Sequence, residues 1–323
     1  MEVIASGIGE FRPPDPDGFR AYVREHKERR LVDKTMSEQD AVAKLVADGD
    51  YLAFDQNVAV RGPASLLREI IRQRKKDLWV AAKFTWTDAS LLVAGGCVSK
   101  IDVGWMATGR LINEAVRKGD VKLIEWTNGA LAYRHLAGSL GVPFLPMRYL
   151  AGTDTFTQSG AKLIEDPYTH GRLCLVPALF PDVALIHAHQ CDIYGNARVM
   201  GAGVAPQEIA MSSRKVIIST EEIIDSEEIR RHPQRTTIPY YFVDAVVHAP
   251  FGGYPGSTPG LYAADVEHWL EFAAAEMQGK TDEYLQKWVF GVASHEEMLD
   301  KLVGAKKLLQ LQKAETVREG YYE

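Results

Sequence analysis

Cysteine is scarce in this sequence, which has only Cys97, Cys174 and Cys191 among 323 residues. These three form no Cys-x-x-Cys pair and their number is odd, which argues against a disulfide-stapled fold and against the usual zinc spacing. The segment Met1–Phe11 also lacks the basic start and apolar core of a secretion signal. We therefore expect reduced thiols and a cytoplasmic location.

Long apolar runs and an excess of positive charge are missing as well. No stretch approaches the roughly 18 uninterrupted apolar residues that a membrane helix needs, so we expect no membrane partner. The formal net charge is −6 at pH 7, whereas a nucleic-acid-binding surface usually shows as a basic patch. We therefore expect no nucleic-acid partner, while a local basic pocket for a small anion remains open.

What is present is the composition of an ordinary soluble protein, with 46% apolar and 25% charged residues. The first half alternates strand-like apolar runs with helix-like segments. The expected strands are 51–54, 78–82, 101–104 and 121–125, and the expected helices follow Ser37 and Pro63 and cover 88–94, 110–118 and 130–140. This alternation predicts an α/β fold with an open, mostly parallel sheet flanked by helices. Ligands bind at the carboxyl ends of such strands, so the loops after Phe54, Glu125 and His189 are the places to search.

The two ends of the chain differ from this pattern. The first 34 residues combine Pro13, Pro14 and Pro16 with charges of both signs, and they are interpreted as an N-terminal extension, 1–34, before one domain, 35–323. Within that domain, further strands are expected at 173–176, 183–189, 197–200, 215–219 and 245–248. From about residue 264 the chain becomes a helical tail, in which Leu302, Leu308, Leu309 and Leu311 are expected to share one buried face.

Several residues have side chains suited to chemistry, each with a simpler structural explanation. His187 and His189 share one face of a strand and could offer two imidazoles to a metal, but no third ligand is evident, so we expect no metal site. Glu221 and Glu222 follow a strand and could act as an acid or base, although structural carboxylates are the simpler interpretation. The glycine-rich segment 251–260 could bring backbone N–H groups to an anion, yet it matches neither a Walker loop nor G-x-G-x-x-G.

Arginines near strand ends are candidates for anion binding. Arg61 and Arg148 flank two expected strand-end loops, and a guanidinium suits a carboxylate or phosphate by bidentate hydrogen bonding. The chain has no G-x-S-x-G elbow and no catalytic cysteine signature. The residues alone therefore indicate an α/β protein that binds a ligand, without naming the ligand.

One longer set of motifs is more specific. The segment 183–196, Val-Ala-Leu-Ile-His-Ala-His-Gln-Cys-Asp-Ile-Tyr-Gly-Asn, is accompanied in order by 48–50, Arg61 with Pro63, 143–146, 221–231, 243–247, 249–253, 260–262, 287–290 and 299–302. Together these resemble the α subunit of family I CoA-transferases, in particular the glutaconate CoA-transferase type, over roughly residues 35–309. The extension 1–34 has no recognised counterpart.

The resemblance implies a heteromeric enzyme whose active site lies between this chain and a β subunit, in αβ units that form α2β2 or larger assemblies. The family's nucleophilic glutamate belongs to the β subunit, and no Ser-Glu-Asn-Gly-type segment occurs here. The implied reaction moves CoA between an acyl-CoA thioester and a carboxylic or dicarboxylic acid by ping-pong covalent catalysis. CoA would then be part of a substrate, and no permanently bound cofactor is implied.

One departure from the family concerns the first strand-end loop. The family has Gly-Gly-Phe there, whereas this chain has Asp55, Gln56 and Asn57. Asp55 adds a Cβ and a negative charge, which opposes an oxyanion unless it is turned away. The resemblance therefore suggests the side-chain amides of Gln56 and Asn57 as replacement oxyanion or substrate donors. The remaining expected substrate contacts are Arg61, Asn128, Arg148, Thr153, Gly252 and Gly253.

The unusual loop also keeps other functions open. The same architecture serves CoA-thioester hydrolases that open rings by C–C bond cleavage, and decarboxylases of glutaconyl-type thioesters. A third interpretation, from another class, is a non-catalytic ligand-sensing subunit, because fold alone does not determine function. Release of CoA without an acceptor acid distinguishes hydrolysis from transfer, and the absence of a partner chain would favour the sensor.

Overall fold

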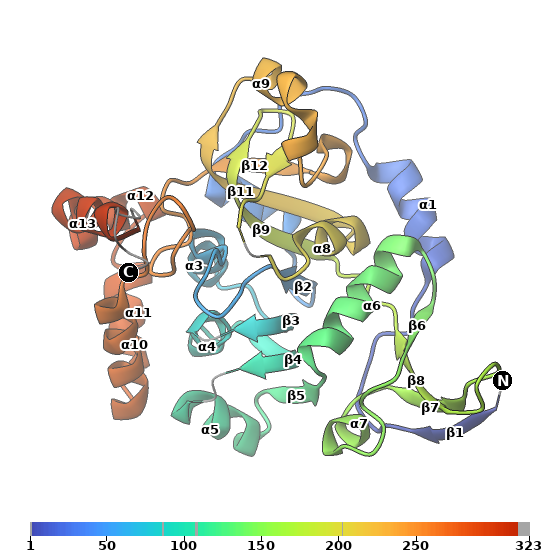
Figure 1. The fold of residues 1–323 in the computed structure, drawn as a ribbon. Helices are drawn as coiled ribbons and strands as arrows, with labels where there is room; N and C mark the ends of the chain where they lie inside the picture. The colour runs from blue at the N-terminus through green and yellow to red at the C-terminus, as the bar shows by residue number, and fades with distance from the viewer. Residues whose placement is uncertain (1, 86, 107–108, 202, 316–323) are drawn as a thin grey trace, which may run out of the picture.

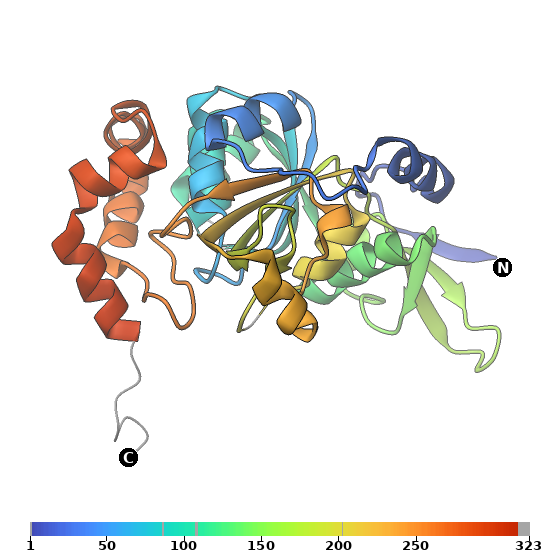
Figure 2. The ribbon, with the colours of Figure 1, turned by 90° about the horizontal axis from the view of Figure 1, so that it is seen from above.

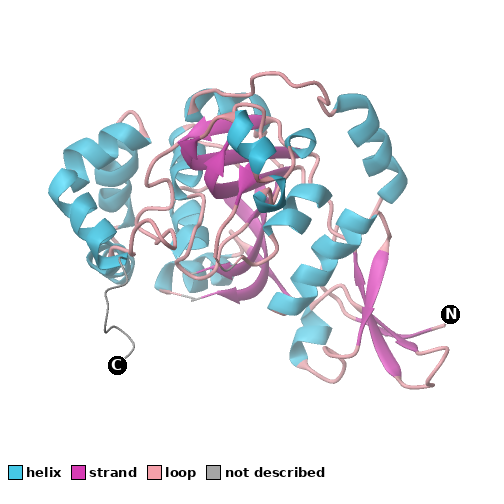
Figure 3. Ribbon diagram, turned by 45° about the horizontal axis from the view of Figure 1, so that its top comes forward, coloured by secondary structure: helices cyan, strands magenta, loops and turns pink. Residues whose placement is uncertain are grey.

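A computed structural model describes residues 2–85, 87–106, 109–201 and 203–315. Its centre is a twisted sheet of parallel strands in the order β12-β11-β9-β2-β3-β4-β5, and a short β10 pairs antiparallel with β9 (Figures 1 and 3). The strands are β2 (Tyr51–Phe54), β3 (Leu78–Thr85), β4 (Val98–Met106), β5 (Lys122–Glu125), β9 (Val183–Cys191), β10 (Ala197–Arg198), β11 (Lys215–Ile223) and β12 (Ala245–His248). The expected open, mostly parallel sheet is confirmed.

Helices cover both faces of this sheet, because the strands are apolar on both sides. On β2, Leu52 and Phe54 face one core and Tyr51 and Ala53 face the other. The first core is covered by α2 (Glu38–Leu45), α3 (Ala64–Arg72), α4 (Thr87–Ala94) and α5 (Arg110–Lys118). The second is covered by α6 (Asn128–Leu140) and α8 (Pro206–Ser212), and α9 (Ser226–Arg231) follows β11.

Local signals in the sequence explain where some of these helices begin. Ser37 is the N-cap of α2, and its hydroxyl accepts a hydrogen bond from Asp40 N at 3.0 Å, as the capping pattern predicts. Pro63 directly precedes α3. Helix α9 begins at Ser226, and Asp225 is its N-cap. Helix α6 is held on the sheet by a buried ion pair between Arg134 and Asp102.

The N-terminal extension is structured. Strand β1 (Val3–Ser6) joins β6 (Phe144–Met147), β7 (Lys162–Glu165) and β8 (Arg172–Pro177) in a separate antiparallel sheet of order β1-β7-β8-β6. Helix α1 (Pro16–His26) follows, and α7 (Asp154–Gln158) precedes β7. The extension is tied to the main sheet by Lys27, whose Nζ donates to the Asp244 carboxylate at 2.5 Å and to Phe242 O at 2.7 Å. Three of these strands, β1, β6 and β7, fall where no strand is expected from the sequence.

The C-terminal part is helical, as expected, and packs at the side of the sheet opposite the small antiparallel sheet (Figure 2). It contains α10 (Val266–Gln278), α11 (Thr281–Leu285), α12 (His295–Met298), α13 (Ala305–Glu315) and π-helical turns at Gln286–Phe290 and Leu299–Val303. Leu311 is buried, but Leu309 is 55% exposed, so the expected common face of the four leucines is wrong at Leu309. Within the described residues, no helix is both long and apolar enough to cross a membrane.

Candidate functional site at the carboxyl ends of the strands

The loop after β2 folds over a buried ion pair. Asp55 Oδ2 lies 2.6 Å from Arg61 Nη2, and both side chains are completely buried. The other oxygen of Asp55 accepts a hydrogen bond from Val204 N at 3.0 Å, and Arg61 donates to His187 O at 3.3 Å. The carboxylate of Asp55 therefore points into the protein, with its charge matched by Arg61. Arg61 has a left-handed φ of 56°, which bends the chain so that its side chain reaches back to Asp55.

Gln56 and Asn57 have different surroundings in the same loop. Gln56 is 4% exposed, and its amide nitrogen donates to Val58 O at 2.8 Å and to the Asp88 carboxyl. Asn57 is half-buried, its backbone pairs with Val60, and its side chain makes no hydrogen bond to the described residues. Both amide donors of Gln56 are thus used to hold the loop, whereas the side-chain amide of Asn57 is available to a ligand.

The Asp88 carboxyl beneath this loop is unusual for an aspartate. It lies on α4 and is 7% exposed. Burial raises the pKa of Asp88 to about 6, although the hydrogen bond from Gln56 opposes the shift. The loop after β2 therefore rests on a carboxyl group whose charge changes near neutral pH.

A second group of polar side chains closes the ends of β9 and β11. His187 Nε2 lies 2.6 Å from Glu221 Oε1, and His187 Nδ1 lies 2.9 Å from Ser219 Oγ. Glu221 also accepts from the Tyr262 hydroxyl and from Phe251 N. Burial alone would raise the pKa of Glu221, but these donors together lower it below its ordinary value. Glu221 is therefore held as a carboxylate by the groups that surround it.

The glycine-rich segment packs directly on this group. A Cβ on Gly252 would clash with the ring of His187, and one on Gly253 would crowd the Tyr262 hydroxyl at 3.1 Å. Gly252 O accepts from Ser65 N at 2.9 Å, which ties the segment to α3. The glycines are thus required by close packing between the segment and the strand ends.

A cavity of about 240 Å³ opens beside Glu221. It is lined by His189, Gln190, Met200, Glu221, Glu222, Pro250, Phe251, Leu261, Tyr262 and Gln312. Both ring nitrogens of His189 are occupied, Nε2 by Pro259 O at 3.0 Å and Nδ1 by Met200 N at 3.1 Å. Among the described residues, no three His, Cys, Asp or Glu side chains are grouped so that they could hold a metal ion.

The remaining expected contacts lie further along the strand ends. Asn128 begins α6, and its Oδ1 is buried without a hydrogen-bond partner in the described part of the chain. Arg148 is exposed in the segment after β6, and Thr153 is the N-cap of α7. The structure thus brings Gln56, Arg61, Gly252 and Gly253 together, whereas Arg148 and Thr153 follow the small antiparallel sheet.

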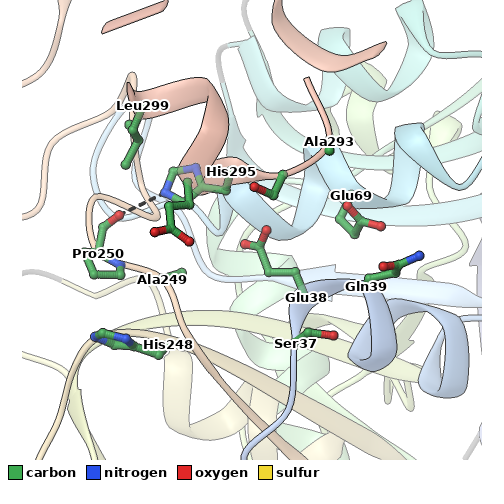
Figure 4. Close-up of a pocket in the computed structure, with 12 residues that line it drawn as sticks. Ser37, Glu38, Gln39, Glu69, His248, Ala249, Pro250, Ala293, His295 and Leu299 are labelled. Atoms are coloured by element: carbon green, nitrogen blue, oxygen red, sulfur yellow. Dashed lines mark hydrogen bonds between the residues drawn. The ribbon is translucent and has the colours of Figure 1, made fainter. Parts of the chain in front are cut away.

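A larger cavity of about 410 Å³ lies between the start of α2, the segment after β12 and α12 (Figure 4). Glu38, Glu69 and Glu296 line it, Glu38 points into it, and the ring of His295 is turned to Pro250 O at 2.9 Å. Burial raises the pKa of Glu38 and lowers that of His295 to about 3. The glutamates that line this cavity make the cavity a poor site for the phosphates of CoA, because like charges repel.

Two polar residues near the strand ends were missed by sequence reasoning. Asp88 lies on a helix that the sequence predicts, but nothing in the sequence shows that it meets Gln56. Lys83 interrupts the apolar run of β3, is only 2% exposed, and has an Nζ with no hydrogen bond to the described residues. The lysine within an otherwise buried strand was the signal that could have found it.

Comparison with known proteins identifies the family. The coenzyme A transferase family model matches residues 35–249. The A-type subunit of glutaconate CoA-transferase from Acidaminococcus fermentans is 31% identical over 304 residues, 87% of this chain and 95% of the relative. The crystal structure of glutaconate CoA-transferase from that organism matches with a TM-score of 0.81 and 30% identity, over 86% of this chain and 95% of the other. The chain therefore belongs to the coenzyme A transferase family, as an enzyme subunit of the A type.

Other relatives differ in the activity that their names give. A protein from Archaeoglobus fulgidus, described as uncharacterized, is 43% identical over 99% of this chain and 73% of its own length. The IpdA subunit of a cholesterol ring-cleaving hydrolase from Rhodococcus jostii is 27% identical over 78% of this chain and 94% of the relative. The decarboxylase AibA/AibB matches with a TM-score of 0.70 and 29% identity, over 79% of this chain and 98% of the other. One fold thus carries transferases, a hydrolase and a decarboxylase.

Proposed function

We propose that this chain is the α subunit of a heteromeric enzyme that moves CoA between an acyl-CoA thioester and a carboxylic or dicarboxylic acid. The similarity to the A-type subunit of glutaconate CoA-transferase, across 87% of the chain, carries this proposal. The partner would be a β subunit that supplies the nucleophilic glutamate, in αβ units that assemble as α2β2 or larger. CoA enters as part of the substrate.

The proposed reaction proceeds in two transfers. The partner's glutamate attacks the thioester carbonyl, an acyl anhydride forms, and CoA leaves as a thiolate. The thiolate then attacks the glutamyl carbonyl of the anhydride, which releases the first acid and leaves CoA bound to the enzyme as a thioester. The acceptor carboxylate repeats these steps in reverse.

In this scheme, the loop after β2 stabilises the oxyanion of the attacked thioester. Asn57 is half-buried and its side-chain amide makes no hydrogen bond to the described residues, so it is the proposed donor. Gln56 orients the loop through Val58 O and Asp88, and Arg61 neutralises Asp55 beneath it. Gly252 and Gly253 shape the rim, while Asn128, Arg148 and Thr153 are proposed as polar contacts further along the cleft.

Substitutions in this loop test the assignment. We expect Asn57→Ala to lower kcat by about 10²–10³-fold, the usual effect of losing one oxyanion donor. Gln56→Ala should lower kcat through a displaced loop. The matched control is Asn113→Ala, because Asn113 is exposed on α5. Unchanged turnover in both loop variants would remove this loop from the mechanism.

The partner is tested by native mass spectrometry of the tagged chain purified from its own cells. The expected result is a second α/β chain of similar size in equal amount, with CoA transfer that requires an added acceptor acid. A chain that runs alone, or only with itself, would contradict the two-subunit enzyme.

A second candidate is a hydrolase or decarboxylase that acts on a CoA thioester. The observation in its favour is the loop Asp55-Gln56-Asn57, at the position where the family resemblance implies glycine in a transferase. A time course without acceptor acid separates the reactions: free CoA appears with a hydrolase, carbon dioxide with a decarboxylase, and neither with a transferase.

A further inference from the structure

Lys83 is a buried cation near the carboxyl end of β3. Its neighbours Ala81 and Ala82 on the strand are apolar, the residue is 2% exposed, and its Nζ has no hydrogen-bond partner in the described part of the chain. Buried ammonium groups are almost always paired, because an uncompensated charge in the interior lowers stability. An unpaired one near a strand-end loop therefore points to a ligand.

The sheet register places Lys83 beside the loop after β2. Ala53 pairs with Ala81 and Ala82 pairs with Val103, so Lys83 lies between Asp55 on one side and Gly104 on the other. Gly104 has no side chain, and Asn128 from α6 packs in the space that a Cβ there would need. Asn128 Oδ1 is also buried without a partner in the described residues. An unpaired cation, Lys83 Nζ, and an unpaired acceptor, Asn128 Oδ1, thus belong to the same row of the sheet.

The charges around Lys83 leave it without a counter-ion of its own. Burial lowers the pKa of Lys83 to about 8, against the attraction of Asp55 and of Glu208 on α8. Asp55 is already bound to Arg61 and to Val204 N, and Glu208 makes no ion pair with Lys83. Lys83 therefore carries a charge at pH 7 and makes no ion pair with the described residues.

The basic groups on α6 add no negative charge near Lys83. His135 is buried, and burial together with the charge of Lys83 lowers its pKa well below the ordinary value, so it is neutral. Arg134 is paired with Asp102. No carboxylate of the described residues thus bonds to Lys83 Nζ, and an external anion would supply the opposite charge.

We propose that Lys83 binds the carboxylate of the acid substrate. This inference rests on the proposed function and names the residue that recognises the acid. Arg61, the first choice from the sequence, is already engaged with Asp55 inside the protein. Lys83 Nζ is enclosed by its neighbours, so a carboxylate reaches it only when side chains at the strand ends move, and its oxygens then accept the Nζ donors.

The experiment compares Lys83→Met and Lys83→Arg with the unchanged protein, each as the complex with its β subunit. The control is Lys122→Met, because Lys122 is exposed on β5 and pairs with Glu10. We expect Lys83→Met to raise KM for the acid at least tenfold and to change KM for the acyl-CoA less than twofold. Lys83→Arg should restore acid binding. Unchanged acid KM in folded Lys83→Met would overturn the proposal.

The pH dependence separates a charge effect from a packing effect. In the unchanged complex, acid KM should rise as the pH increases through about 8, because Lys83 loses its proton. In Lys83→Arg this rise should vanish, because arginine stays protonated. The same rise in both proteins would overturn the proposal, even if Lys83→Met failed to fold.

A binding measurement keeps the inference separate from the proposed reaction. If the complex transfers no CoA with any acid, acetate serves as the probe carboxylate, and thermal unfolding is followed in acetate against chloride of equal ionic strength. The inference expects acetate to raise Tm for the unchanged protein and Lys83→Arg, and not for Lys83→Met. No shift in the unchanged protein, or a crystal structure in acetate with only water at Lys83, would overturn it.

Discussion

Asp55 and Arg61 bury two opposite charges directly under the loop after β2. Removing one partner leaves the other charge uncompensated, which costs about 3–5 kcal/mol in comparable buried pairs. We expect Asp55→Asn and Arg61→Met each to lower the free energy of unfolding by this order, measured by urea denaturation. The double variant should lose clearly less than the sum of the two, because no unpaired charge remains.

The account would be contradicted if the losses of unfolding free energy in Asp55→Asn and Arg61→Met simply added in the double variant. Independent sites add within about 0.5 kcal/mol. If the double variant loses the full sum, Asp55 and Arg61 do not act as a pair, and the inward direction of Asp55 has another cause.

Asp88 carries a pH dependence of its own. Its pKa is about 6 in the folded protein and about 3.8 when exposed. The folded state therefore holds a proton that the unfolded chain releases, so stability from this group falls as the pH rises from about 4 through 6. Asp88→Asn keeps an oxygen that accepts from Gln56 and removes the titration.

We expect Asp88→Asn to reduce the loss of unfolding free energy between pH 5 and pH 7 by about 1 kcal/mol relative to the unchanged protein. Urea denaturation of both proteins at the two pH values measures this difference. Equal changes in the two proteins would mean that Asp88 is already ionised at pH 5.

At the level of elements, the contact between β4 and α6 depends on Gly104. A Cβ there would meet Asn128 Oδ1 and Lys83 O, and the second of these is backbone that cannot turn away. We expect Gly104→Ala to lower the free energy of unfolding by about 1–3 kcal/mol through overpacking. Gly171→Ala is the control, because the nearest atom to its Cβ is Thr169 Oγ1 at 3.4 Å. Equal stability of the two variants would show that α6 can shift freely on β4.

A strand could be predicted from the sequence where a local apolar pattern marks it, and not where it forms only by pairing with a distant segment. The parallel strands β2, β9 and β11 are buried on both faces, so each is an apolar run that is readable without knowing its neighbours. Strand β1 has only four residues, mostly exposed, and exists because it pairs with β7 about 160 residues away. Such long-range pairing leaves no local pattern.

The same distinction applies to the candidate site. The sequence indicates the loop Asp55-Gln56-Asn57 because it follows a clear strand. It does not indicate that Gln56 turns inward, since this depends on Asp88, 32 residues further along the chain. The isolation of Lys83 depends likewise on Arg61 having taken Asp55. Which side chains pair is decided by packing between elements, and one sequence shows only the order in which they occur.

In the whole molecule, two buried histidines connect the C-terminal helices to α3 and to the segment after β12. His295 lies 2.9 Å from Arg68 on α3, and His268 on α10 bonds to Tyr254 at 2.9 Å and to Tyr284 at 2.6 Å. Burial, with the charge of Arg68, lowers the pKa of both to about 3. Both are therefore neutral in the folded protein at any pH near physiological.

Because both histidines are neutral when buried, the stability of the contact between the C-terminal helices and the rest of the chain depends on pH. Below about pH 6.5 the unfolded chain binds protons at these histidines, whereas the folded chain does not. Their contribution to the free energy of unfolding is therefore fully present above that pH and is lost as the pH falls towards 3. Each histidine should cost about 1 kcal/mol between pH 6.5 and 5.5. Urea unfolding followed by tryptophan fluorescence suits the measurement, because the ring of Trp288 lies 4.0 Å from that of His268. We expect His268→Gln to have a lower free energy of unfolding at pH 7.5 but to lose about 1 kcal/mol less of it between pH 6.5 and 5.5 than the unchanged protein does. The same dependence of unfolding free energy on pH in both proteins would show that His268 is already protonated in the folded protein.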